Sequence, residues 1–116
     1  MSEVRVKRAY DPPAPGDGVR VLMDRLWPRG RRRDEAKIDL WLKEAAPSAK
    51  LRRWFGHAPA RWTEFQNCYR AKLADNAALD GLLAMAKQGK PVTLLFGARN
   101  VERNNAVVLQ ALCDRG

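Results

Sequence analysis

The chain has 116 residues, a formal net charge of +9 at pH 7, and 46% hydrophobic residues. This length fits one domain, residues 1–116, and the hydrophobic fraction excludes a disordered chain. No apolar run reaches the roughly 18 residues of a membrane span. The residues after Met1 also lack the apolar segment of a secretion signal. We therefore expect a cytoplasmic protein with no membrane contact.

The first half of the chain predicts three strands. Residues 4–10 alternate between apolar and polar side chains, which is typical of a strand with one covered face. A loop rich in proline and glycine follows at residues 11–18. Residues 19–26 are apolar on both faces, as in an interior strand covered by helices on each side. Residues 38–44 alternate again and predict the third strand.

Helix start and stop signals dominate the next part of the chain. Ser48 is a good N-cap for a short helix through Phe55, and Gly56 is a suitable stop. Pro59 opens a second helix that runs to about residue 73. Asn76 caps a third helix, which ends before the proline at position 91.

The end of the chain completes an α/β pattern. Residues 91–96 are the most strongly patterned strand, and a final helix follows the loop at residues 97–100. Strands on either side of a helical block indicate a single small α/β domain, with a mixed, mostly parallel sheet of about four strands flanked by helices. The link between the first two strands is too short for a crossover helix, so we expect one antiparallel pair.

The second and fourth predicted strands are each followed by a loop with glycine and arginine. Ligands in open α/β sheets bind outside the carboxyl ends of the strands. If these two strands run parallel, Arg25, Arg29 and Arg99 gather at one edge of the sheet. Asn100 is a further candidate ligand-binding residue at this edge, and the helix after it then offers free backbone N–H groups there. Guanidinium groups bind carboxylate or phosphate through paired hydrogen bonds, so the sequence predicts a site for a small anionic ligand such as a nucleotide.

Asp24 lies at the end of a buried strand, where an unpaired charge costs on the order of several kcal/mol. Two explanations are open. In the first, Asp24 orients Arg25 or acts as an acid–base group, while Asn104 binds a polar edge of the ligand. In the second, Asp24 pairs with Arg99 or Lys7 and only holds the sheet together. The sequence therefore leaves open whether the protein is an enzyme.

Other chemistries lack the residues that they need. His57 is the only histidine, and Cys68 and Cys113 have no metal-ligand spacing, so we expect no metal and two free thiols. Neither a GxGxxG nor a Walker motif is present, and we expect no cofactor.

The basic excess gives an alternative function. A nucleic-acid-binding module could use the arginine cluster in residues 29–33 together with Lys50, Arg52 and Arg53. A third possibility is that the four tryptophans line an interface between two copies, and we expect a monomer or a weak homodimer.

Several segments carry a resemblance to a known family. They are KRAYDP at 7–12, VLMDRLWPRG at 21–30, LWLKE at 40–44, LRRWF at 51–55, and TLLF with ARN at 93–100. With these segments the chain resembles the YeaO-like proteins, small uncharacterised bacterial proteins within a larger family of unknown function. The resemblance covers nearly the whole chain and implies a compact cytoplasmic α/β domain with polar motifs at its strand ends. It also implies an aspartate before Pro59, where this chain has Ala58.

Overall fold

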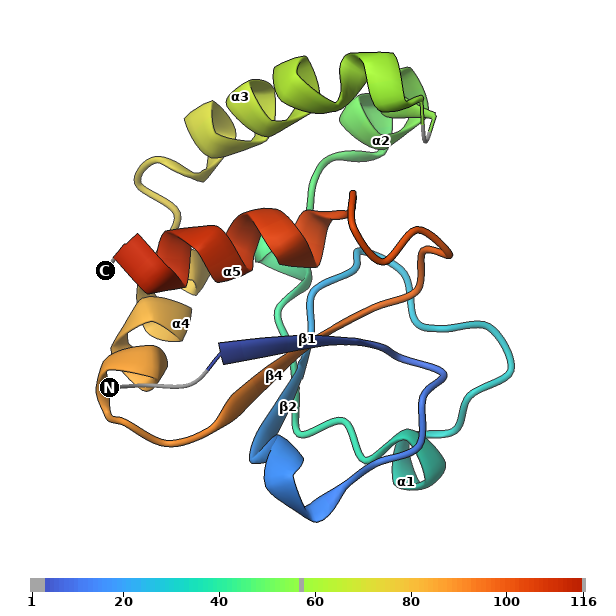
Figure 1. Ribbon diagram of the computed structural model, residues 1–116, viewed down its shortest axis with the longest axis vertical. Helices are drawn as coiled ribbons and strands as arrows, with labels where there is room; N and C mark the ends of the chain where they lie inside the picture. The colour runs from blue at the N-terminus through green and yellow to red at the C-terminus, as the bar shows by residue number, and fades with distance from the viewer. Residues whose placement is uncertain (1–3, 57, 116) are drawn as a thin grey trace.

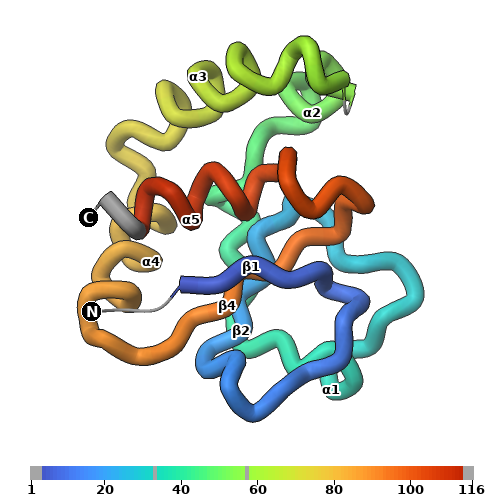
Figure 2. Tube along the Cα trace, in the orientation of Figure 1, coloured from blue at the N-terminus to red at the C-terminus, as the bar shows by residue number. Residues whose placement is uncertain are grey.

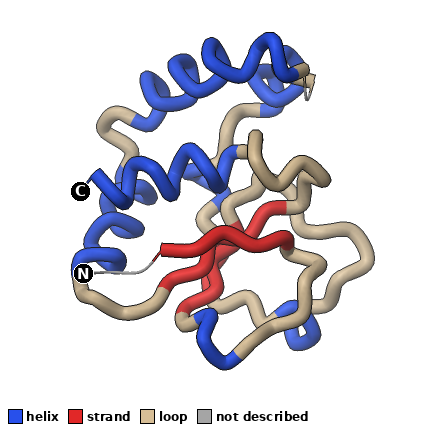
Figure 3. Tube along the Cα trace, viewed as in Figure 1, coloured by secondary structure: helices blue, strands red, loops and turns tan. Residues whose placement is uncertain are grey.

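The centre of the molecule is a four-stranded sheet in which all strands run parallel (Figures 1 and 3). This computed structural model describes residues 4–56 and 58–115. The order across the sheet is β1-β4-β2-β3, where the strands are β1 Val4–Arg8, β2 Val19–Leu22, β3 Leu40–Trp41 and β4 Val92–Phe96.

Helices cover the two faces of the sheet unequally (Figures 1 and 2). The larger core packs against α2 Ala49–Phe55, α3 Trp62–Leu73, α4 Ala77–Lys87 and α5 Asn105–Arg115. The opposite face has a smaller core under loops and the short helix α1 Arg33–Ala36. Three 3-10 turns, Pro15–Asp17, Lys43–Ala45 and Pro59–Arg61, complete the elements of the described chain.

The α/β class and the four strands are confirmed, but the expected antiparallel pair is wrong. β1 and β2 each pair in parallel with β4, which lies between them. Residues 9–18 therefore carry the chain back to the other end of the sheet without forming a hairpin. About ten extended residues can span roughly 30 Å, which exceeds the length of a five-residue strand. A link of this length can therefore connect two parallel strands without a crossover helix, so its shortness was not evidence for an antiparallel pair.

All four strands are shorter than predicted: β1 ends at Arg8 and β4 begins at Val92, and the largest differences are in β2 and β3. β2 ends at Leu22, and the Met23 N–H makes one more sheet bond, to the Leu95 carbonyl at 3.0 Å, before the chain turns away. The third strand shrinks from residues 38–44 to β3, Leu40–Trp41. Apolar and polar side chains continue to alternate in the sequence after β3. The backbone nevertheless forms a 3-10 turn there, in which the Ala45 N–H donates to the Leu42 carbonyl at 3.0 Å.

The predicted helix signals are confirmed. Ser48 Oγ accepts a hydrogen bond from the Leu51 N–H at 3.1 Å, and Gly56 ends α2 in the left-handed conformation with a φ of 51°. Asn76 Oδ1 accepts from the Leu79 N–H at 3.0 Å and caps α4. Pro59 opens a 3-10 turn that leads directly into α3.

Ala58 precedes this turn as an N-cap without a side-chain hydrogen bond. We expect Ala58→Asp to increase the free energy of unfolding by about 1 kcal/mol, because an aspartate at an N-cap accepts from a free N–H. For a domain of this size that corresponds to about 4 °C in melting temperature. Thermal unfolding followed by circular dichroism measures the change. Ala60→Asp adds the same charge inside the turn and serves as the control. An unchanged or lower melting temperature for Ala58→Asp would contradict this helix start.

The strand at the outer edge, β1, has hydrogen-bonding partners at both ends. The Gln110 side-chain amide on α5 donates to the Val4 carbonyl at 3.0 Å. At the other end, Asp11 Oδ2 accepts from the Arg8 N–H at 3.1 Å.

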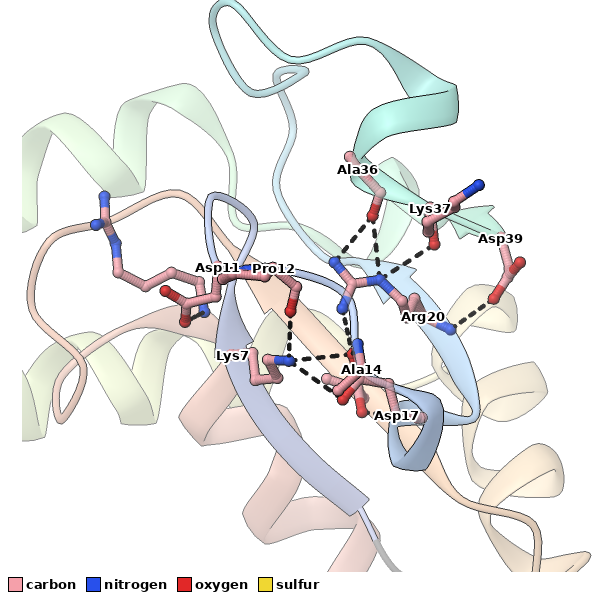
Figure 4. Close-up of polar contacts among 11 residues, drawn as sticks. Lys7, Asp11, Pro12, Ala14, Asp17, Arg20, Ala36, Lys37 and Asp39 are labelled. Atoms are coloured by element: carbon pink, nitrogen blue, oxygen red, sulfur yellow. Dashed lines mark hydrogen bonds and ion pairs between the residues drawn. The ribbon is translucent and has the colours of Figure 1, made fainter.

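A buried ion network fixes the start of β2 (Figure 4). The side chains of Asp17 and Arg20, each about 4% exposed or less, form an ion pair, and Lys7 Nζ lies 3.1 Å from Asp17 Oδ2. Arg20 also donates to the carbonyls of Ala36 and Lys37 at 2.9 to 3.1 Å. The network therefore ties β1, β2 and the segment after α1 together.

Among the described residues no helix is long and apolar enough to cross a membrane.

Candidate functional site

A pocket of about 290 Å³ opens at the carboxyl ends of β2 and β4. Small-molecule sites begin at about this size, and in open α/β sheets they lie at this edge. The loops after β2 and β4, together with α2, α3 and the start of α5, contribute to its wall, which consists of Asp24, Pro47, Arg52, Arg53, Phe55, Phe65, Gly97, Ala98, Arg103, Asn104 and Asn105.

Hydrogen bonds fix the backbone and the carboxylate of Asp24 at the end of β2. Its Oδ2 accepts from the Gly97 N–H at 2.7 Å, and its carbonyl accepts from Trp41 Nε1 at 2.8 Å. The Asn105 amide donates to the neighbouring Met23 carbonyl at 2.7 Å. β2, β3, β4 and α5 are thereby joined around this one residue.

Burial raises the pKa of the Asp24 carboxyl above its usual value, and the Gly97 N–H, the Asn105 side chain and the charge of Arg52 offset this only in part. In the described part of the chain no basic group lies within 4.0 Å of Asp24. The pairing with Arg99 or Lys7 is therefore wrong, since Lys7 pairs with Asp17 and a backbone N–H binds Asp24 instead.

Three arginines that were not among the predicted anion-site residues line the pocket. Arg52 and Arg103 are half-buried, and Arg53 is exposed. Their guanidinium groups form no hydrogen bond or ion pair with the residues that the structure describes. Arg103 could have been predicted from the sequence, because it directly precedes Asn104 and Asn105 at the start of the last helix and therefore lies close to the predicted site.

The predicted site residues are only partly brought together. Asp24 and Asn104 line the pocket, while Arg99 and Asn100 line an adjoining hollow that shares Gly97 and Ala98 with it. Arg25 and Arg29 are exposed and line neither. Hydrogen bonds from Trp27 Nε1 to the Arg31 carbonyl and from Tyr10 Oη to the Arg29 carbonyl fix the backbone of their loop.

The two predicted asparagines also have structural partners. Asn100 Oδ1 accepts from the N–H groups of Glu102 and Arg103 at 2.9 and 3.0 Å. Asn104 is 3% exposed, donates to the Asn100 carbonyl, and accepts from the Val107 N–H at 3.0 Å as the cap of α5. The start of α5 therefore lies at the pocket, where its dipole favours an anion.

The raised pKa of Asp24 predicts a pH-dependent effect of Asp24→Asn. When the folded pKa exceeds the unfolded value of about 3.9, the carboxyl costs stability as it ionises in the fold. The wild type should therefore lose stability relative to Asp24→Asn as the pH rises from about 4 through the folded pKa. Urea unfolding of both proteins between about pH 3 and pH 7 measures this difference. A difference that stays constant with pH would contradict the prediction.

Among the described residues, no group of three or more His, Cys, Asp or Glu side chains could hold a metal ion. Cys68 is half-buried and Cys113 is buried, and no disulfide joins these two residues. His57 lies outside the described residues.

The fold and the pocket define a small parallel α/β domain with a pocket at the carboxyl ends of its strands. Over residues 3–115 the chain matches the family model described as the inactive DUF488-N3 subclade, and it belongs to that family. It is 42% identical over 113 residues to an uncharacterized protein of Mycobacterium tuberculosis strain H37Rv, covering 97% of this chain and 95% of the relative. It is 40% identical over 106 residues to the uncharacterized protein YeaO of Escherichia coli, covering 91% and 92%.

The resemblance to YeaO-like proteins is thus confirmed. No solved structure gives a significant match.

Proposed function

We propose that this protein binds a small anionic ligand, bearing a phosphate or a carboxylate, in the pocket at the ends of β2 and β4. One observation carries the proposal: Arg52 and Arg103 are half-buried in the pocket wall and have no acceptor among the described residues. Guanidinium groups that lose water need hydrogen-bond acceptors, and an oxyanion supplies them in pairs.

The surroundings of the two arginines support an anion of limited size. α5 begins at the pocket, so its dipole adds to the positive potential there. Phe55 and Phe65, whose ring centroids are 4.6 Å apart, form an apolar part of the wall. The family description calls the subclade inactive, which favours binding without turnover, and Asp24 has no catalytic role in this proposal.

Arg52→Ala is expected to weaken the binding of a nucleoside monophosphate or inorganic phosphate by tenfold to a hundredfold. Hydrogen bonds to charged groups contribute roughly 1.5–3 kcal/mol, and about 1.4 kcal/mol corresponds to tenfold. Isothermal titration calorimetry measures the affinities. Arg25→Ala removes an exposed arginine outside the pocket and should bind as the wild type does. Equal affinity of Arg52→Ala and wild type would overturn the proposal.

Nucleic acid is the second candidate, favoured by the net charge of +9 and by the exposed basic residues Arg29, Arg32, Lys50 and Arg53. Neutralising several phosphates makes affinity fall steeply with salt, with a slope of about −0.7 to −0.9 per contact. A small ligand held by two arginines gives a much shallower slope. Measuring the affinity for an oligonucleotide and for a mononucleotide across a salt series therefore distinguishes the two functions.

Most of the tryptophan surface is already used within the molecule. Trp27 and Trp41 pack edge to face with centroids 5.3 Å apart, and Trp62 stacks near Phe65 at 5.8 Å. Trp54 is exposed, with the Arg61 guanidinium over its ring. The expected monomer or weak homodimer stays a prediction, which sedimentation at low concentration tests.

A further inference from the structure

The pocket contains a carboxylate as well as arginines. Asp24 lines the same wall as Arg52 and Arg103, and the charge of Arg52 acts on it from beyond 4.0 Å. The Gly97 N–H and the Asn105 side chain engage Asp24. These two donors leave acceptor capacity free, because an ionised carboxylate offers about four lone-pair sites.

This carboxylate restricts which anions fit. A ligand with only negative charge places a second anion beside Asp24, and their repulsion grows as the ligand displaces water from the pocket. Filling the pocket also removes water from Asp24 itself, and a buried carboxylate without enough donors is costly. A favourable ligand therefore brings a donor to Asp24 together with an anion for the arginines.

We propose that the ligand is a small zwitterion, with a cationic nitrogen that binds Asp24 and a phosphate or carboxylate that binds Arg52 and Arg103. This inference rests on the anion site proposed above and names the class of molecule that the site takes. Phe55 and Phe65 are 6% and 2% exposed and give the short carbon chain between the two charges an apolar surface.

Two pairs of probes test the inference by calorimetry. Phosphoethanolamine and ethyl phosphate share a phosphate and a two-carbon chain, but only the first carries an ammonium group. β-Alanine and propionate form the corresponding carboxylate pair. We expect the wild type to bind the ammonium member of at least one pair ten times or more tightly than its partner. The pair that binds more tightly identifies phosphate or carboxylate as the anion.

Asp24→Asn should remove this preference and raise the affinity for the purely anionic probe, because asparagine keeps an acceptor for the Gly97 N–H but loses the charge that repels the anion. Arg52→Ala should weaken both members of a pair alike. Should Asp24→Asn fail to fold, the pH dependence of the wild-type preference replaces it. Protonation of Asp24 removes the preference at low pH, and ethyl phosphate corrects for titration of the phosphate.

The outcomes separate this inference from the proposed function. Equal binding of both members of each pair, or a preference that survives in Asp24→Asn, overturns the zwitterion inference and leaves the anion site standing. Equal binding by wild type and Arg52→Ala overturns the anion site and the inference with it. Failure of all four probes to bind at millimolar concentration contradicts both.

Discussion

Asp17→Ala is expected to lower the free energy of unfolding by about 3–5 kcal/mol, because it leaves Arg20 buried without its counter-charge. Domains of this kind have only about 5–15 kcal/mol in total, so the loss is a large fraction. Urea unfolding measures it. Asp34→Ala breaks an ion pair whose side chains are 76% and 68% exposed, and such pairs contribute about 0–1 kcal/mol, which makes it the control.

The contribution of Asp17 should also disappear in acid. Burial alone raises the pKa of this carboxyl, but hydrogen bonds from the Ala14 N–H, Lys7 and Arg20 outweigh it and lower the pKa below its usual value. A lowered folded pKa stabilises the protein above the unfolded value of about 3.9, and this stabilisation is lost as the pH falls through the folded pKa. The difference between wild type and Asp17→Ala should therefore shrink below about pH 4. A difference that persists to about pH 2 would show that the carboxylate is not the stabilising form.

Gly18→Ala is the second substitution with a large expected effect, a loss of about 3 kcal/mol or roughly 12 °C in melting temperature. Gly18 has a φ of 65°, and a Cβ there would lie 2.1 Å from the Pro91 carbonyl oxygen. That oxygen accepts the Val19 N–H at 3.0 Å, so relieving the clash separates β2 from β4. Thermal unfolding measures the loss.

Gly81→Ala is the matched control for this substitution. Gly81 lies inside α4, and a Cβ there meets no atom within 4 Å. Alanine favours the helix over glycine by about 1 kcal/mol, so this variant should melt slightly above the wild type. Similar melting temperatures for Gly18→Ala and the wild type would contradict the close approach of Gly18 to Pro91.

Local signals predicted much of the fold. β4 is a continuous apolar run, and Ser48, Gly56 and Asn76 act through hydrogen bonds or backbone angles within a few residues of themselves. The order of the strands could not be predicted in this way. It depends on β4 entering between β1 and β2 from more than sixty residues away in the chain.

The residues of the candidate site likewise include some that local sequence signals predict and some that depend on tertiary packing. Asp24 and Asn104 were predictable because each lies at the end of an element that borders the pocket. Arg52 joins them only because α2, packed against α3, forms part of the pocket wall, which no local pattern reveals. Arg25 directly follows Asp24 in sequence, yet it is exposed and lies outside the pocket.

The hydrogen bonds at the outer strand have a consequence for how the molecule behaves when concentrated. Exposed strand edges are templates on which other chains assemble into fibrils. Here Gln110 and Asp11 occupy the two ends of β1, and on the opposite border β3 has only two residues. Within residues 4–56 and 58–115, neither border offers a long row of unsatisfied amides, so this part of the architecture opposes amyloid growth.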